Sequence, residues 1–87
     1  MSVLDSIFNY NERLIVEEMA KQLADDDCTE EQLSDIACLA LNKVPAKYIK
    51  HSVDRAFYMS MEDRVALEEG VTEAVAEAIR FIMEAEH

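Results

Sequence analysis

Residues 29–42 read TEEQLSDIACLALN, and this stretch carries the clearest structural signal in the chain. Thr29 followed three residues later by Gln32 fits a capping box, which predicts that a helix starts here. The residues that follow are apolar almost all round, as far as Asn42. A helix without a wide polar face is buried by its neighbours. We therefore predict a central helix that ends near Asn42, because Pro45 disfavours helical backbone at Val44.

Helical patterns flank this segment on both sides. Residues 4–23 place apolar side chains on one broad face, with Ser2 or Asp5 as the expected cap. The acid run 25–27 then breaks the pattern and is predicted to be a solvated loop. Ser60 followed by Asp63 is a second capping signal, and a last helix is expected from there to about residue 85. Gly70 inside it predicts a bend or a tight helix crossing.

The composition indicates the fold class. The chain has 87 residues, 51% of them hydrophobic, with one Gly and one Pro. This composition is typical of a single all-α domain, residues 1–87, with three to four helices and a short connecting segment after Pro45. Residues 45–59 leave two alternatives open, a short helix or an extended segment. Because so short a chain buries a limited core, an intimate homodimer is expected.

The sequence also predicts location and metal content. We find no signal peptide and no apolar run long enough to span a membrane, so a cytoplasmic protein with reduced thiols is expected. Cys38 is predicted to be a small core residue and Cys28 a loop thiol. With His51 and His87 they do not form the closely spaced ligand set of a structural zinc site. No metal and no cofactor are therefore expected.

Catalysis is not expected either. A hydrolase or transferase needs a nucleophile beside a base. His51 is the one credible base within the chain, and no Ser or Cys stands near it in a recognisable arrangement. The many carboxylates are spread over helix faces, as solvated side chains usually are. The sequence thus predicts a protein that is not an enzyme.

The charge is unevenly distributed. The formal net charge is −11, which argues against nucleic-acid binding because that needs a cationic surface. Residues 43–55 are the exception. They hold half of the eight Lys and Arg side chains against one acid, Asp54. The four basic side chains of this stretch, which we call the basic segment, are Lys43, Lys47, Lys50 and Arg55.

Residues 35–49, DIACLALNKVPAKYI, resemble the signature of the late competence development ComFB family. Asp35, the Ala40-Leu41-Asn42 run, Pro45 and Tyr48 match that pattern in register. The order of a helix before the segment and a long helix after it extends the likeness over most of the chain. Lys47 is a departure, since many relatives have Arg there and Lys lacks the two-pronged fork of a guanidinium.

The resemblance implies a small, helical, dimeric protein. Some members of the family are described as receptors for the second messenger cyclic di-GMP, linked to pili and natural competence. Some relatives also carry zinc and extra cysteines between the first two helices, where this chain has only Cys28.

The basic segment suits such a ligand. The phosphates of cyclic di-GMP need Lys or Arg, and its guanines offer a donor edge to a carboxylate. The flat faces of the guanines stack on aromatic rings. The candidate ligand-binding residues are Lys43, Lys47, Tyr48, Lys50, Asp54 and Arg55, with Tyr58 nearby.

A second interpretation stays open. The basic side chains can simply balance the surrounding acids, with Tyr48 and Phe57 in the core. The chain would then be an interaction adaptor that binds an unknown protein partner and no small ligand.

Overall fold

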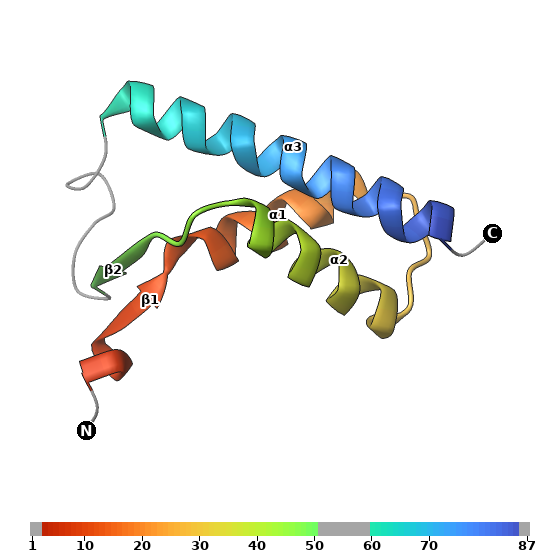
Figure 1. The fold of residues 1–87 in the computed structure, drawn as a ribbon, viewed down its shortest axis with the longest axis horizontal. Coiled ribbons are helices and arrows are strands. Elements are labelled where there is room, and N and C mark those ends of the chain that lie inside the picture. The colour runs from red at the N-terminus through yellow and green to blue at the C-terminus, as the bar shows by residue number, and fades with distance from the viewer. Residues whose placement is uncertain (1–2, 51–59, 86–87) are drawn as a thin grey trace.

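The computed structural model describes residues 3–50 and 60–85. In this part of the chain three α-helices, α1 (Tyr10–Gln22), α2 (Glu30–Lys43) and α3 (Met61–Ala85), pack together. A short 3-10 helix (Val3–Ser6) precedes strand β1 (Ile7–Asn9), and strand β2 (Tyr48–Lys50) follows α2. Figure 1 shows α3 lying along α1 and α2, with the two strands at the end of the molecule opposite the C-terminus. The predicted helices are present, and the small sheet corrects the all-α expectation.

Helix α2 begins and ends close to where its sequence predicts, but Ile36 and Ala40 are its only buried residues, so it is not the fully covered central helix that the apolar pattern indicates. The backbone N–H of Gln32 donates to Oγ1 of Thr29 at 3.0 Å, and the N–H of Thr29 donates to Oε1 of Gln32 at 2.9 Å. This reciprocal capping box satisfies two N–H groups that the first helical turn leaves without partners. The helix ends at Lys43, and Val44 is extended before Pro45. The acid run 25–27 lies exposed in the loop before α2, as predicted.

Helix α3 also begins at its predicted cap, where the N–H of Asp63 donates to Oγ of Ser60 at 3.1 Å. Its buried stripe is shorter than the apolar pattern suggests. Met61 and Val65 are 73% and 46% exposed, and fully buried positions begin at Val71. The reason is length, since α3 has 25 residues whereas α1 and α2 have 13 and 14. The shorter helices do not cover its first turns.

The predicted helix over residues 4–23 is wrong in its first third. Helix α1 begins at Tyr10, and its N-cap is Asn9 rather than Ser2 or Asp5. Residues 7–9 form β1 instead, paired antiparallel with β2. Their apolar spacing fits a helix, but pairing with a segment about 40 residues away offers their backbone groups an alternative partner. Tertiary pairing therefore overrides the local pattern.

The core lies where the three helices meet. Its members come from one face of each helix and are listed here: Ile15, Met19, Leu23, Ile36, Ala40, Val71, Ala74, Val75 and Ala78. Each large aliphatic side chain buried in this way contributes about 1.5–3 kcal/mol of transfer free energy. The alanines of α2 and α3 allow these two helices, which share the most extensive interface, to approach closely.

Cys38 is not the core residue that the sequence predicts, whereas Cys28 lies in the loop between α1 and α2, as predicted. Cys38 is exposed, whereas Cys28 is partly buried and packs against the core. The helical period explains the first, because Ile36 and Ala40 are fully buried and a residue midway between them points to the other side of α2.

Gly70 does not mark a tight crossing. A Cβ atom built at this position meets no atom within 4 Å, and its φ is not positive. Glycine in a helix interior is less favourable than alanine because its unfolded backbone has more freedom to lose. The packing of the chain therefore gives no reason for glycine here.

We expect Gly70→Ala to raise the free energy of unfolding by about 1 kcal/mol. Urea denaturation followed by circular dichroism measures this change. The matched control is Ala66→Gly at an exposed position one turn earlier in α3, which is expected to lower stability by a similar amount. A loss of stability in the alanine variant would contradict the open space seen around Gly70.

Candidate functional site

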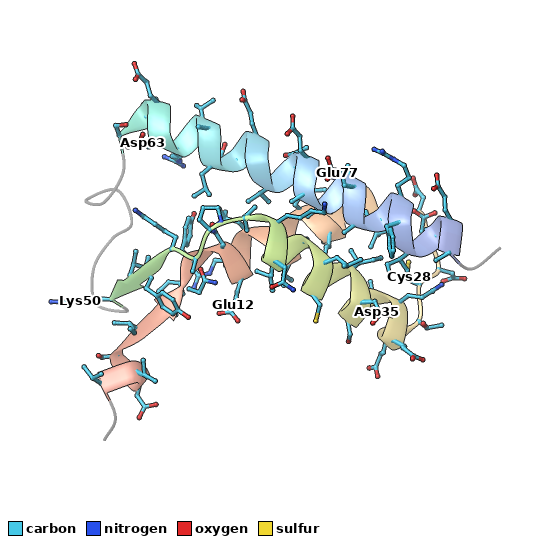
Figure 2. All side chains as sticks on the ribbon, in the orientation of Figure 1. Glu12, Cys28, Asp35, Lys50, Asp63 and Glu77 are labelled. Carbon is cyan, nitrogen blue, oxygen red and sulfur yellow. The ribbon has the colours of Figure 1, made fainter. Side chains whose placement is uncertain are left out.

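Strands β1 and β2 form a two-stranded ribbon that displays part of the basic segment. The register pairs Ile7 with Lys50, Phe8 with Ile49 and Asn9 with Tyr48. Alternate residues of a strand point to opposite faces. Tyr48 and Lys50 therefore share one face, while Ile49 turns to the other and is buried. Figure 2 shows Lys50 at the end of the ribbon, directed away from the helices.

Two asparagines hold the segment before β2 against the start of α1. Oδ1 of Asn9 accepts from the backbone N–H of Asn11 at 3.2 Å and from that of Lys47 at 2.8 Å. The N–H of Tyr10 donates to the carbonyl of Lys47 at 2.6 Å. Nδ2 of Asn11 donates to the carbonyl of Pro45. We call this set of hydrogen bonds the asparagine clamp, and it fixes where Tyr48 and Lys50 lie.

Asn11 is the buried polar residue of the clamp. Its side chain is 0% exposed, and its Oδ1 atom has no hydrogen-bond partner among the described residues. A buried acceptor without a partner costs stability, and the bond from Nδ2 to Pro45 offsets that cost. The position of the chain at Pro45 is thus fixed by a polar contact inside the molecule.

Arg13 joins the ribbon from α1. Its guanidinium carbon lies 5.3 Å from the centre of the Phe8 ring, a cation–π distance. Sequence reasoning missed Arg13 because it lies far from the basic segment along the chain. The signal that identifies it is its position one turn inside α1, beside a strand that the helical pattern concealed.

The structure divides the predicted site residues into groups. Lys47, Tyr48 and Lys50 lie together at the ribbon. Lys43 lies apart, in the last turn of α2, where its Nζ is 2.9 Å from Oε2 of Glu77 on α3. The remaining two candidates, Asp54 and Arg55, lie outside the described residues, and so do Phe57 and Tyr58.

The Lys43–Glu77 ion pair has an electrostatic consequence. The hydrogen bond and the positive charge of Lys43 lower the pKa of Glu77, and the charge of Arg80 lowers it further. A carboxylate whose pKa is depressed by folding stabilises the protein above its unfolded pKa, and this contribution is lost as the pH falls through the folded value. Both side chains are about half exposed, so the pair is screened by solvent. The ammonium group of Lys43 therefore lies against α3 and not beside the ribbon.

Tyr48 is the exposed aromatic side chain of the ribbon. It is 60% exposed, which rules out the alternative that this side chain is part of the core. An exposed aromatic ring flanked along the chain by two ammonium groups suits a flat base that carries phosphate. The ring offers a stacking face, and the ammonium groups attract the anion.

Metal chemistry has no assembled site in the described part of the chain. The residues there hold no group of three or more His, Cys, Asp and Glu side chains placed to bind an ion. His51 and His87 lie outside these residues, so the absence of metal stays a prediction. Within the same residues, no helix combines the length and the apolar character needed to cross a membrane.

The fold and the ribbon define a small, mostly helical domain with an exposed basic and aromatic surface. The family model of the late competence development protein ComFB matches residues 8–86. The chain belongs to this family, which confirms the resemblance seen in residues 35–49, and the membership points to a role related to competence. No curated protein and no solved structure matches the chain.

We expect Asn11→Ala to lower the free energy of unfolding by about 1–3 kcal/mol, because it removes the bond to Pro45 and leaves a small cavity. Hydrogen exchange of the amides of residues 47–50 is expected to accelerate more than that of α3. The matched control is Asn42→Ala at an exposed position of α2, which is expected to change neither quantity. Unchanged exchange at β2 in the Asn11 variant would show that the clamp does not hold the strand.

Proposed function

We propose that this chain is a non-enzymatic regulatory protein of the cytoplasm that binds cyclic di-GMP at the β1–β2 ribbon and influences competence or pilus functions. The observation that carries the proposal is Tyr48, 60% exposed between Lys47 and Lys50 in a member of the ComFB family. The ligand class comes from the family resemblance, and the exposed ring and its cationic neighbours support it.

Each chemical part of the ligand has a counterpart in the chain. The ring of Tyr48 stacks on a guanine, and the ammonium group of Lys50 on the same face contacts a phosphate. Lys47, which is partly buried directly before Tyr48, supplies a second positive charge near the same site. Arg55 and Asp54, assigned from sequence alone, add a further cation and an acceptor for the guanine donor edge.

The overall charge of the chain favours this location. A dianion that approaches a protein of net charge −11 is repelled over most of its surface. Lys47 and Lys50 stand where the local charge reverses, and the ribbon places Lys50 away from the acidic helices (Figure 2). Lys43 contributes less than these two because it lies apart from the ribbon, in the last turn of α2, with its ammonium group against Glu77.

In this proposal the chain acts as a homodimer whose interface is formed by α2 and α3. A hollow of about 460 Å³ between these helices, the α2–α3 hollow, is lined by Leu39, Lys43, Glu77, Ala78, Arg80, Phe81 and Glu84. Phe81 is 64% exposed beside it. A two-fold interface places the same patch on both subunits, so a patch with both signs of charge is self-complementary. This face meets that condition and supplies an aromatic anchor.

A second function is favoured by the apolar side chains that the fold leaves exposed, Val16, Met61, Val65 and Phe81. Such side chains suit an interaction adaptor that binds a protein and no nucleotide. Calorimetry of the parent chain with cyclic di-GMP separates the two functions, because the adaptor releases no heat of binding.

We expect Tyr48→Ala to weaken cyclic di-GMP binding by about ten- to a hundredfold, since stacking of one base on an aromatic ring contributes about 1–3 kcal/mol. Lys50→Glu is expected to weaken it at least as much through the lost phosphate contact. The matched control is Lys21→Glu, which makes the same charge change on an exposed face of α1. If the two ribbon variants titrate the nucleotide as tightly as the parent, the site lies elsewhere.

We expect Phe81→Glu to convert a homodimer into a monomer while the helical circular dichroism persists, because it places a charge at the apolar centre of the interface. Light scattering at micromolar concentration measures the mass, which is 9.9 kDa for one chain. Val65→Glu, at another exposed apolar position of α3, is the control and is expected to remain dimeric. A monomeric parent would contradict the proposed dimer.

A further inference from the structure

A second apolar surface lies between α1 and α2, on the far side of α2 from the proposed dimer face. It is a groove of about 500 Å³, here the α1–α2 groove, lined by Val16, Met19, Ala20, Leu23, Asp26, Cys28, Leu33, Ser34 and Ala37. Met19 and Leu23 are buried and form its floor, whereas Val16 is 62% exposed at its edge. The groove therefore reaches down to side chains that belong to the core.

The charge on the lining of the groove is acidic. Asp26 is the one charged side chain among the described residues that line it. Asp25 and Asp27 flank Asp26 in the exposed loop at one end, and Glu12 lies one turn before Val16 toward the other. Figure 2 shows Glu12 and Cys28 well apart along the long axis of the molecule.

The basic side chains of α1 do not reach this groove. Arg13 lies over the ring of Phe8 on β1, and Lys21 lines a different hollow between α1 and α3. No cation from α1 therefore lines the groove beside Asp26. An occupant that supplies positive charge at its ends complements this surface.

The dimensions of the groove select the form of the occupant. Along α1 it extends from Val16 to Leu23, about two helical turns or roughly 10 Å. A trough of this length between two helices receives the apolar face of a third helix, whose side chains at one-turn spacing fill it. We propose that the α1–α2 groove binds an amphipathic helix of a partner protein, with apolar residues on one face and Lys or Arg at the flanks. This inference goes beyond the proposed function and does not depend on nucleotide binding at the ribbon.

A second copy of the chain does not match the groove. The described helices are themselves acidic, and each would bring carboxylates against Asp26 and Glu12. Like charges facing one another at an interface oppose association. The α2–α3 hollow differs because both signs of charge line it. The charge pattern thus assigns self-association to one face and a cationic partner to the other.

The test uses a fluorescein-labelled synthetic peptide of roughly 14 residues, with Leu at one-turn spacing on one face and Lys elsewhere, long enough to form a helix on binding. Fluorescence anisotropy with the full chain is expected to show saturable binding. Val16→Glu is expected to weaken it about tenfold or more, because a charge enters the apolar edge of the groove. The same change adds negative charge, so binding driven by charge alone would become tighter instead.

Two controls make the result decisive. Ala66→Glu adds the same charge at an exposed position of α3 outside the groove and is expected to bind the peptide like the parent. A peptide with Glu in place of Lys is expected not to bind. The proposal is overturned if Val16→Glu binds the Lys peptide as tightly as the parent, or if the Glu peptide binds equally well. It is also overturned if Val16→Glu changes the mass of the chain in light scattering, since the groove would then be an interface between copies.

Discussion

One side-chain oxygen has two roles on which the arrangement of this molecule depends. Oδ1 of Asn9 caps α1 through the N–H of Asn11 and holds the backbone of Lys47 at the same time. The first bond sets where α1 begins, and the second sets where the chain enters β2. The register of the ribbon follows, because Asn9 is paired with Tyr48. The exposure of Tyr48, on which the proposed binding site rests, is thus determined at the N-terminus of a helix.

The sequence predicts the helices whose first turns are capped by residues close to them in the chain. Thr29 with Gln32 and Ser60 with Asp63 mark the starts of α2 and α3, and the structure shows both sets of capping bonds. The start of α1 escapes prediction because its cap is identified by a partner in the segment before β2. Leu4 fits the helical face by spacing, yet it precedes a strand and is 67% exposed. Local patterns do not contain the pairing that decides these residues.

The candidate site shows the same division. Tyr48 and Lys50 are near one another in sequence and remain so in space, because an extended strand keeps alternate residues on one face. Lys43 belongs to the same basic segment, but it is helical, and its charge is directed to Glu77. Arg13 and Glu77 are brought to Phe8 and Lys43 by tertiary packing. Sequence thus identifies the chemical groups of the site, whereas the change from helix to strand after Pro45 decides which of them act together.

The asparagine clamp also joins two segments that are distant in the chain. The bond between Asn9 and Lys47 joins residues 38 positions apart, so it closes a long loop and carries a corresponding cost in chain entropy. Because packing of α1 against α2 shortens the effective length of that loop, we expect the ribbon to form after the helical hairpin. On a ribosome, all residues of the clamp emerge before α3 does. The surface that carries Tyr48 can therefore form on a hairpin of α1 and α2 before α3 covers the remaining apolar face of that hairpin.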